Sequence, residues 1–353
     1  MHSTETSYVV RLRFGSDAKL RRRFMVTDED VPSNLRFGLL LERLDKLAEE
    51  TALRYVRRTF PEARVVTAAM DSLLVRSMPD INRDVVMRAR INLVGRSSME
   101  VGVRIEQPGE PLLHIGSSYF TMVGRVREND EEKSVPLPPL EYKSKMEQLR
   151  RDRGLARRER YRAAVNLAAE PPSREEYEML RRLHEAQEQP GTKLLLASKQ
   201  VTEGWERTYP EYENVPKKIF GGWVAHRAYT YAHICAERLA SHRMLLASVD
   251  RINFYHPVRM GDKLHFVSRV TYTGNTSVSV ETEITRISRD RKETALSNVC
   301  AFTFIHMGTQ MERLPVQQLH PTTYAEDARY LAGYRRRKAY LEWKEQTAKK
   351  SEG

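Results

Sequence analysis

Two features of this sequence combine residue types and spacing that could do chemistry. Asp45 lies in a stretch with helical apolar spacing, between Leu44 and Leu47. A carboxylate about two turns into a buried helix is partly desolvated, which raises its pKa and makes it a competent base. Gly221 and Gly222 open a second apolar helical stretch, where free backbone N–H groups and the positive end of the helix dipole could stabilise an oxyanion. A base and an oxyanion site are what the hydrolysis of an acyl group requires.

Each of these residues also has a plain structural explanation. Asp45 could be an ordinary charge on the polar side of an amphipathic helix. The pair Gly221-Gly222 could simply permit close packing. Asn214, which shortly precedes a proline, could be a turn residue. The local pattern alone leaves these alternatives open.

Several other chemistries lack the residues they need. The two cysteines, Cys235 and Cys300, form no CxxC motif, so we expect neither a disulfide scaffold nor a cysteine-rich metal site. Two thiols fit a reducing compartment. His226, His233 and His256 have no metal-ligand spacing with one another or with a nearby acid, so we expect structural roles and no metal. A serine hydrolase is not expected, because there is no G-x-S-x-G elbow.

An internal repeat indicates the elements that position these residues. Asp250 lies 179 residues after Asp71, and the same offset aligns residues 95–101 with residues 274–280. In each copy a glycine opens a helical stretch, and segments rich in alternating Val, Ile, Thr, Tyr and Phe follow. Strands are expected at 85–91, 99–105, 264–272 and 278–287. Gly95 and Gly274 lie between strands, so we expect turns with positive φ there.

The repeat predicts an α+β fold in which each copy covers one helix with an antiparallel sheet. Four segments are expected: a first domain with an N-terminal extension (1–127), a charged helical linker (128–200), a second domain (201–312) and a charged tail helix (313–353). Within the linker, Ser173 and Glu176 form the N-cap pattern of a helix that follows two prolines. The tail helix is expected over 330–350.

Composition bounds the class of protein. The 353 residues are 40% hydrophobic and 30% charged, which is enough apolar material for real cores. We expect no membrane span, because no run approaches about 18 apolar residues. The net charge of +12 favours an anionic partner, such as a phosphate-bearing cofactor or nucleic acid. The N-terminal arginines are accompanied by Glu5 and Asp17 and by no apolar stretch, which predicts no secretory signal and only a poor transit peptide.

One segment resembles a known family. Residues 214–223 resemble the asparagine-to-double-glycine motif that opens the central helix of hotdog acyl-CoA thioesterases. Residues 247–254, with Pro257 and Gly261-Asp262, resemble the next strand and turn, and residues 36–45 match the helix in the first copy. The resemblance covers nearly the whole chain. It implies a tandem (double) hotdog, in which each antiparallel sheet wraps around a central helix.

Hotdog thioesterases build a site from two units: one supplies an asparagine before its helix, and the other supplies a carboxylate inside its helix. Asp45 lies seven residues after Gly38, and Asn214 lies eight residues before Gly222. The equivalent positions of the other copy hold Tyr229 and Asp30. The resemblance therefore implies one composite catalytic site of Asp45, Asn214 and Gly222, and a degenerate second pair.

The implied reaction is hydrolysis of fatty acyl-CoA to free fatty acid and CoA, with no separate cofactor because CoA is part of the substrate. Asp45 would activate water, or would attack the thioester through a covalent anhydride; the sequence leaves both open. Asn214 would orient the water or the thioester carbonyl. Because CoA carries phosphates, we expect a basic groove. Its candidate residues are Gly221, Lys217, Lys218, Arg96, Ser97 and Ser98.

Two other functions remain open. The net charge and the basic run 150–162 would suit an inactive hotdog that binds CoA or takes part in a ribonucleoprotein assembly. Nucleic acid is the less favoured partner, because no aromatic-interleaved RNA motif is visible. A hotdog hydratase or dehydratase would use an Asp–His or Glu–His pair, for which His256 is the only candidate. The resemblance also implies a dimer or trimer of chains in the mitochondrial matrix, with the cytoplasm as the alternative.

Overall fold

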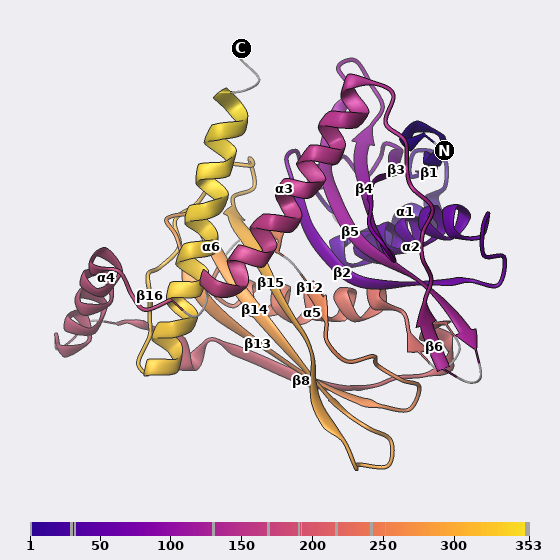
Figure 1. The fold of residues 1–353 in the computed structure, drawn as a ribbon. Coiled ribbons are helices and arrows are strands. Elements are labelled where there is room, and N and C mark those ends of the chain that lie inside the picture. The colour runs from indigo at the N-terminus through magenta and orange to yellow at the C-terminus, as the bar shows by residue number, and fades with distance from the viewer. Residues whose placement is uncertain are drawn as a thin grey trace.

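The computed structural model describes residues 2–28, 31, 33–128, 131–167, 170–189, 191, 193–215, 218–240, 243–250 and 252–349, with side chains except at 162–167, 214–215 and 343–349. A twelve-stranded antiparallel sheet runs through the molecule in the order β1-β3-β4-β5-β2-β11-β15-β14-β13-β8. β6 pairs with β5, and β12 pairs with both β15 and β2. The first half of the chain thus supplies one side of the sheet, and the second half supplies the other (Figure 1).

The strands of the first half are β1 (Tyr8–Leu12), β2 (Arg64–Val75), β3 (Val85–Val94), β4 (Ser98–Gln107), β5 (Leu113–Glu128) and β6 (Glu131–Ser134). Those of the second half are β8 (Val201–Arg207), β11 (Arg243–Val249), β12 (Ile252–Phe254), β13 (Lys263–Thr273), β14 (Ser277–Ile287) and β15 (Thr294–Met307). Two small sheets pair β9 (Glu213–Val215) with β10 (Lys218–Ile219), and β7 (Leu195–Leu196) with β16 (Leu319–His320). The helices are α1 (Ala18–Phe24), α2 (Phe37–Val56), α3 (Lys145–Leu167), α4 (Arg174–Glu185), α5 (Gly221–Glu237) and α6 (Tyr324–Lys349). The short 3₁₀ turns are η1 (Ser3–Thr6), η2 (Ala186–Glu188), η3 (Ala197–Lys199) and η4 (Pro210–Tyr212).

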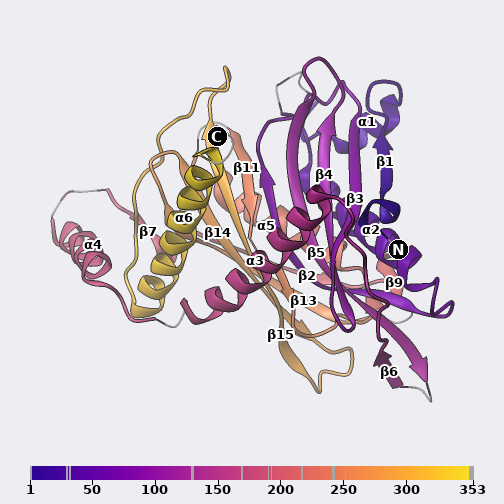
Figure 2. The ribbon, with the colours of Figure 1, turned by 45° about the horizontal axis from the view of Figure 1, so that its top comes forward.

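Each half wraps its strands around one central helix, α2 in the first half and α5 in the second. In α2 the leucines recur every three or four residues, so Leu40, Leu44 and Leu47 fall on one face and are buried. The two helices pack against each other on one face of the sheet (Figures 1 and 2). This is the tandem hotdog that the sequence predicts, and the predicted strands all occur. The boundaries of the four predicted segments stay a prediction.

The two halves are joined through the middle of the sheet. β2 pairs with β11 and β12 in antiparallel register, with Leu73 opposite Val249 and Met70 opposite Ile252. The buried apolar side chains form a cluster that includes residues from both halves. No helix in the described ranges is long and apolar enough to cross a membrane.

Gly95 and Gly274 lie in turns as predicted, but the prediction of a positive φ at these glycines is wrong. Neither glycine has a positive φ. Each is the first residue of a turn that it closes by donating its N–H to the carbonyl of Ser98 or Ser277. A Cβ on Gly274 would lie 2.9 Å from the Oγ of Ser277. Glycine therefore serves here to make room for a serine side chain, not to reach a left-handed backbone conformation.

The outer face of the sheet carries α3 and α6, which the sequence repeat also relates (Figure 2). α6 begins 179 residues after α3, which is the offset between the two sheets. The matched pairs are Ser144 and Thr323, Glu147 and Glu326, Gly154 and Gly333, Arg157 and Arg336, and Tyr161 and Tyr340. The backbone N–H groups of Glu147 and Glu326 donate to the Ser144 and Thr323 hydroxyls respectively, so both helices begin with the same cap. The duplicated unit is therefore a hotdog followed by a covering helix.

The covering helices are attached by arginines at equivalent positions. Arg157 of α3 donates two hydrogen bonds to Glu100 of β4. Its counterpart Arg336 of α6 donates to Glu281 of β14 at 3.2 Å. α6 begins at Tyr324, after the cap at Thr323, whereas the sequence pattern predicts a tail helix that begins at residue 330. The expected cap at Ser173 is confirmed, since it forms a capping box with Glu176 at the start of α4.

Candidate active site

Asp45 is a buried carboxylate on the inner face of α2, with only 3% of its surface exposed. The hydroxyl of Thr67, on β2, donates a 2.7 Å hydrogen bond to its Oδ1. Among the described residues, its other oxygen, Oδ2, has no hydrogen-bond partner. α2 and β2 therefore fix one oxygen of the carboxylate and leave the other available.

The open oxygen of Asp45 faces the start of α5, from the other half of the chain. A Cβ placed on Gly221 would lie 3.4 Å from Oδ2 of Asp45 and 3.0 Å from the ring of Phe254. A Cβ on Gly222 would lie 3.0 Å from the Cα of Glu42. The glycine pair thus allows close packing, which is the structural role that the sequence leaves open for it. The same packing brings the first N–H groups of α5, which lack acceptors inside the helix, close to the carboxylate.

Burial raises the pKa of Asp45 from 3.8 to about 7. Desolvation is the largest cause, and the nearby Glu49 adds to it, because both penalise the ionised form. The hydrogen bond from Thr67, the N–H of Gly222 and the charge of Lys46 act in the opposite direction. The Gly222 N–H is near enough to lower the pKa of Asp45 but does not reach Oδ2 in hydrogen-bond geometry. A carboxyl group with a pKa near 7 is suited to general-base catalysis at neutral pH.

The hairpin β9–β10 leads directly into α5. Asn214 lies on β9 within this hairpin, and its side chain is outside the described part of the structure, as is Lys217 altogether. Two contacts seat the hairpin on the helix. The N–H of Phe220 donates to the carbonyl of Tyr212, and the ring of Tyr212 stacks on Trp223 at 4.4 Å. The backbone of Asn214 therefore lies in the hairpin that precedes α5, and its role in the site stays a prediction.

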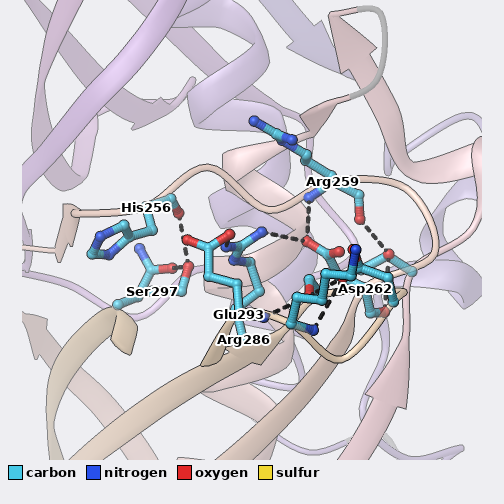
Figure 3. Close-up of polar contacts among 11 residues, drawn as sticks. His256, Arg259, Asp262, Arg286, Glu293 and Ser297 are labelled. Carbon is cyan, nitrogen blue, oxygen red and sulfur yellow. Dashed lines mark hydrogen bonds and ion pairs between the residues drawn. The ribbon is translucent and has the colours of Figure 1, made fainter. Parts of the chain in front are cut away.

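A buried ion pair anchors the loop beside this hairpin. Figure 3 shows the guanidinium of Arg286 between Asp262 and Glu293. Asp262 also accepts the N–H of Arg259 at 2.9 Å, which closes the turn at the end of the loop. Within the loop, the carbonyl of Val258 accepts the N–H of Ile219 in β10. This network fixes the strand that immediately precedes Phe220 and the glycine pair.

The equivalent location in the other half is filled by side chains. Tyr229, at the position that corresponds to Asp45, is buried among the aromatic rings of Phe302, Phe304 and His233. Phe37, which takes the place of Gly221, is buried as well. Asp30, the other member of this pair, lies outside the described residues. Tyr229 thus packs in the core, where the first half has a carboxylate.

The predicted CoA-binding residues lie in two separate places. Lys218 lies on β10 next to the glycine pair and forms an ion pair with Glu132 of β6. Arg96 and Ser97 form the turn between β3 and β4, and Ser98 lines a cavity of about 180 Å³ between the sheet and α3. That cavity also contains the side chains of Asp71, Glu100, Arg158 and Tyr161. A second cavity, of about 230 Å³, lies where α6 begins, between Arg269 and Arg329.

Sequence reasoning did not identify four residues in or beside the site. Thr67 orients Asp45, Phe254 bounds the glycine pair, and His226 meets Glu42 across the two halves at 2.7 Å. Position in the repeat could have drawn attention to Glu42 and His226, since each lies four residues after its helix glycine. Within the described ranges, no group of three or more His, Cys, Asp or Glu residues is placed to hold a metal ion.

Comparisons with known proteins agree with this architecture. A sequence profile of the thioesterase superfamily matches residues 217–292. Human mitochondrial acyl-coenzyme A thioesterase 9 is 28% identical over 93% of this chain and 76% of its own length. An uncharacterized acyl-CoA thioester hydrolase from Zymomonas mobilis is 30% identical over 33% of this chain and 79% of its own length.

The fold has a full-length counterpart among solved structures. A structure from Lactobacillus plantarum that carries the name oleoyl thioesterase superposes with a TM-score of 0.51 over 86% of this chain and 96% of its own, at 9% identity. At that identity the likeness concerns the fold alone. This fold agrees with the family that the sequence matches indicate. The chain therefore belongs to the hotdog thioesterase superfamily, among its acyl-CoA thioesterases.

Proposed function

We propose that this protein hydrolyses acyl-CoA thioesters at one composite site, with the carboxylate of Asp45 from the first half and the glycine pair and Asn214 from the second. The observation that carries the proposal is the buried Oδ2 of Asp45 facing Gly221 at the start of a helix from the other half. A base with a pKa near 7 and a set of helix N–H donors are then adjacent.

The proposed chemistry follows from this arrangement. The thioester carbonyl oxygen would point at the N–H groups at the start of α5, which stabilise the negative charge that develops on it. Asp45, held by Thr67, would take a proton from the attacking water through Oδ2. The tetrahedral intermediate would then expel the CoA thiolate and leave the free acid. Direct attack by Asp45, through an anhydride that water cleaves, uses the same geometry and remains the alternative.

Substrate recognition and cellular context are further parts of the proposal. We assign the phosphates of CoA to Lys217 and Lys218, which precede the glycine pair, and to Arg96, Ser97 and Ser98 in the turn between β3 and β4. Fatty acyl-CoA is the proposed substrate class. The mitochondrial human relative supports a mitochondrial matrix location, and the family resemblance supports a dimer or trimer of chains.

The test is an assay of thiol release from short-, medium- and long-chain acyl-CoA. We expect the wild type to hydrolyse at least one class, and Asp45→Ala and Asn214→Ala to lower kcat by about 100-fold or more. Tyr229→Phe, at the position equivalent to Asp45 in the other half, serves as the matched control and should keep its activity. A folded wild type that is inactive on every chain length would sink the proposal. It would favour the non-catalytic alternative, in which the exposed arginines of α3 bind an anionic partner.

A further inference from the structure

A histidine–carboxylate pair joins the two central helices and has no part in the chemistry proposed above. Nδ1 of His226, on α5, lies 2.7 Å from Oε1 of Glu42, on α2. His226 is 7% exposed, and the side chain of Glu42 is also largely covered. Each residue lies four positions after the glycine that opens its helix, Gly38 or Gly222. Equivalent residues of the two copies thus meet each other where the helices cross.

Each member of the pair lies on the glycine of the opposite helix. A Cβ on Gly38 would lie 2.1 Å from Cδ2 of His226, so the imidazole occupies the space that any side chain there would need. A Cβ on Gly222 would lie 3.0 Å from the Cα of Glu42. The two glycines therefore permit a close approach of the helices, and the hydrogen bond fixes that approach at one separation.

The position of this contact along the two helices places it close to the candidate active site. Glu42 precedes Asp45 by one turn of α2, and His226 follows Gly222 by one turn of α5. Because the helices run in opposite directions, the pair lies one turn away from the place where Oδ2 of Asp45 faces Gly221. A change in helix separation at the pair would therefore change the distance between Asp45 and the N–H groups of α5.

We propose that Glu42 and His226 are positioning residues that hold the N-terminus of α5 against Asp45. The proposal rests on the function assigned above. Neither side chain touches the thioester; both act through Gly222 and Asp45. By keeping the helices closely packed, the pair also keeps water away from Asp45, whose other charged neighbours are Glu49 and Lys46 on its own helix.

The experiment compares Glu42→Ala and His226→Ala with wild type. A misplacement of about 1 Å can cost on the order of 100-fold in rate, so we expect kcat to fall by about 10- to 100-fold, with a smaller change in KM. Water that enters between the loosened helices should also move the acid limb of the kcat–pH profile to lower pH. Glu42→Gln retains an acceptor for the imidazole and should restore most of the rate.

Two further variants make the result interpretable. Glu42→Asp keeps the charge but shortens the side chain by one methylene, so it should lose rate even if the alanine variants fail to fold. Glu237→Ala removes the other Glu–His contact of α5, which His233 makes within the same helix at 3.6 Å. This control loses a Glu–His ion pair that does not bridge the halves, and its kcat and pH profile should match those of the wild type.

A readout that needs no activity separates this inference from the proposed function. The pH dependence of unfolding, compared with and without Asp45→Asn, reports the pKa of Asp45 in the folded state. We expect that pKa to fall when Glu42→Ala is introduced. If Glu42→Ala and Glu42→Asp leave both this pKa and kcat unchanged, the pair has only a structural role and the inference is wrong. If instead Asp45→Asn remains active, it is the proposed function that fails.

Discussion

At the scale of single residues, Asp45 shows how this fold would make a weak acid reactive. Its pKa in the folded protein is about 7, against 3.8 for an ordinary aspartate, because it is buried. Between these values the folded state holds a proton that the unfolded state has released. The free energy of unfolding therefore falls as pH rises from about 4 to 7. The protein is less stable at the pH at which Asp45 is ionised and can act as a base.

Replacing Asp45 should make the protein more stable at neutral and alkaline pH. A rise in pKa from 3.8 to about 7 corresponds to about 4 kcal/mol. The free energy of unfolding of Asp45→Asn should therefore be larger than that of the wild type by up to about this amount at pH 8, and by little at pH 4. Urea unfolding between pH 4 and 8 measures the difference. The exposed Asp152→Asn is the control. A stability difference that does not vary with pH would contradict the raised pKa.

The residues of the site were predictable to different degrees. Asp45 and the glycine pair could be paired from the sequence, because counting along two duplicated helices gives a register. Thr67 could not be found in this way, since its contact with Asp45 depends on how β2 lies against α2. The same applies to Glu42 and His226, which approach each other only when the two helices pack. CoA recognition is the least predictable part, because basic residues occur throughout this chain.

At the scale of elements, the sequence predicts the central helices and the strands well. Their burial on one face imposes strong periodicity, as in the leucines of α2 and the alternating residues of β14. The relation between α3 and α6 is harder to see. Both are charged helices that cover the sheet with few large apolar side chains. The sequence similarity between them is therefore limited to single matched residues that lie one or two turns apart. Arg157 and Arg336 are recognisable as partners only once both are seen to bind glutamates of the sheet.

These equivalent arginines should differ in what they contribute to stability. Arg157 and Glu100 are both nearly buried, with side chains 13% and 9% exposed, whereas Arg336 is 31% exposed. Arg157→Ala leaves a buried carboxylate without its partner and should cost about 3–5 kcal/mol. Arg336→Ala should cost about 1 kcal/mol, since water can replace the arginine. Urea denaturation of both variants tests the contrast.

A double variant separates the ion pair from the packing of α3. Replacing both Arg157 and Glu100 removes the unpaired charge, so Arg157→Ala/Glu100→Ala should recover part of the stability that Arg157→Ala loses. If the double variant is less stable than the wild type by the sum of the two single losses, the two residues do not interact energetically.

At the scale of the whole molecule, the two copies of the repeat form one continuous sheet whose two faces are covered by different helices. α2 and α5 fill the inner face of the sheet, and α3 and α6 lie on the outer one (Figures 1 and 2). A further copy of the chain would therefore meet covering helices or sheet edges at these places, and not a bare sheet. The two halves differ in chemistry, because one retains Asp45 where the other has Tyr229.

The same arrangement predicts that the two halves unfold together. They share a continuous sheet through β2 and β11, and a common apolar cluster that includes Leu40 and Phe302. All three tryptophans lie in the second half of the sequence, so their fluorescence reports on that half, whereas far-UV circular dichroism reports on the whole chain. We expect the two signals to give coincident urea transitions. A fluorescence midpoint that differs from the dichroism midpoint would show that one half can unfold while the other stays folded, and that the composite site is lost at that point.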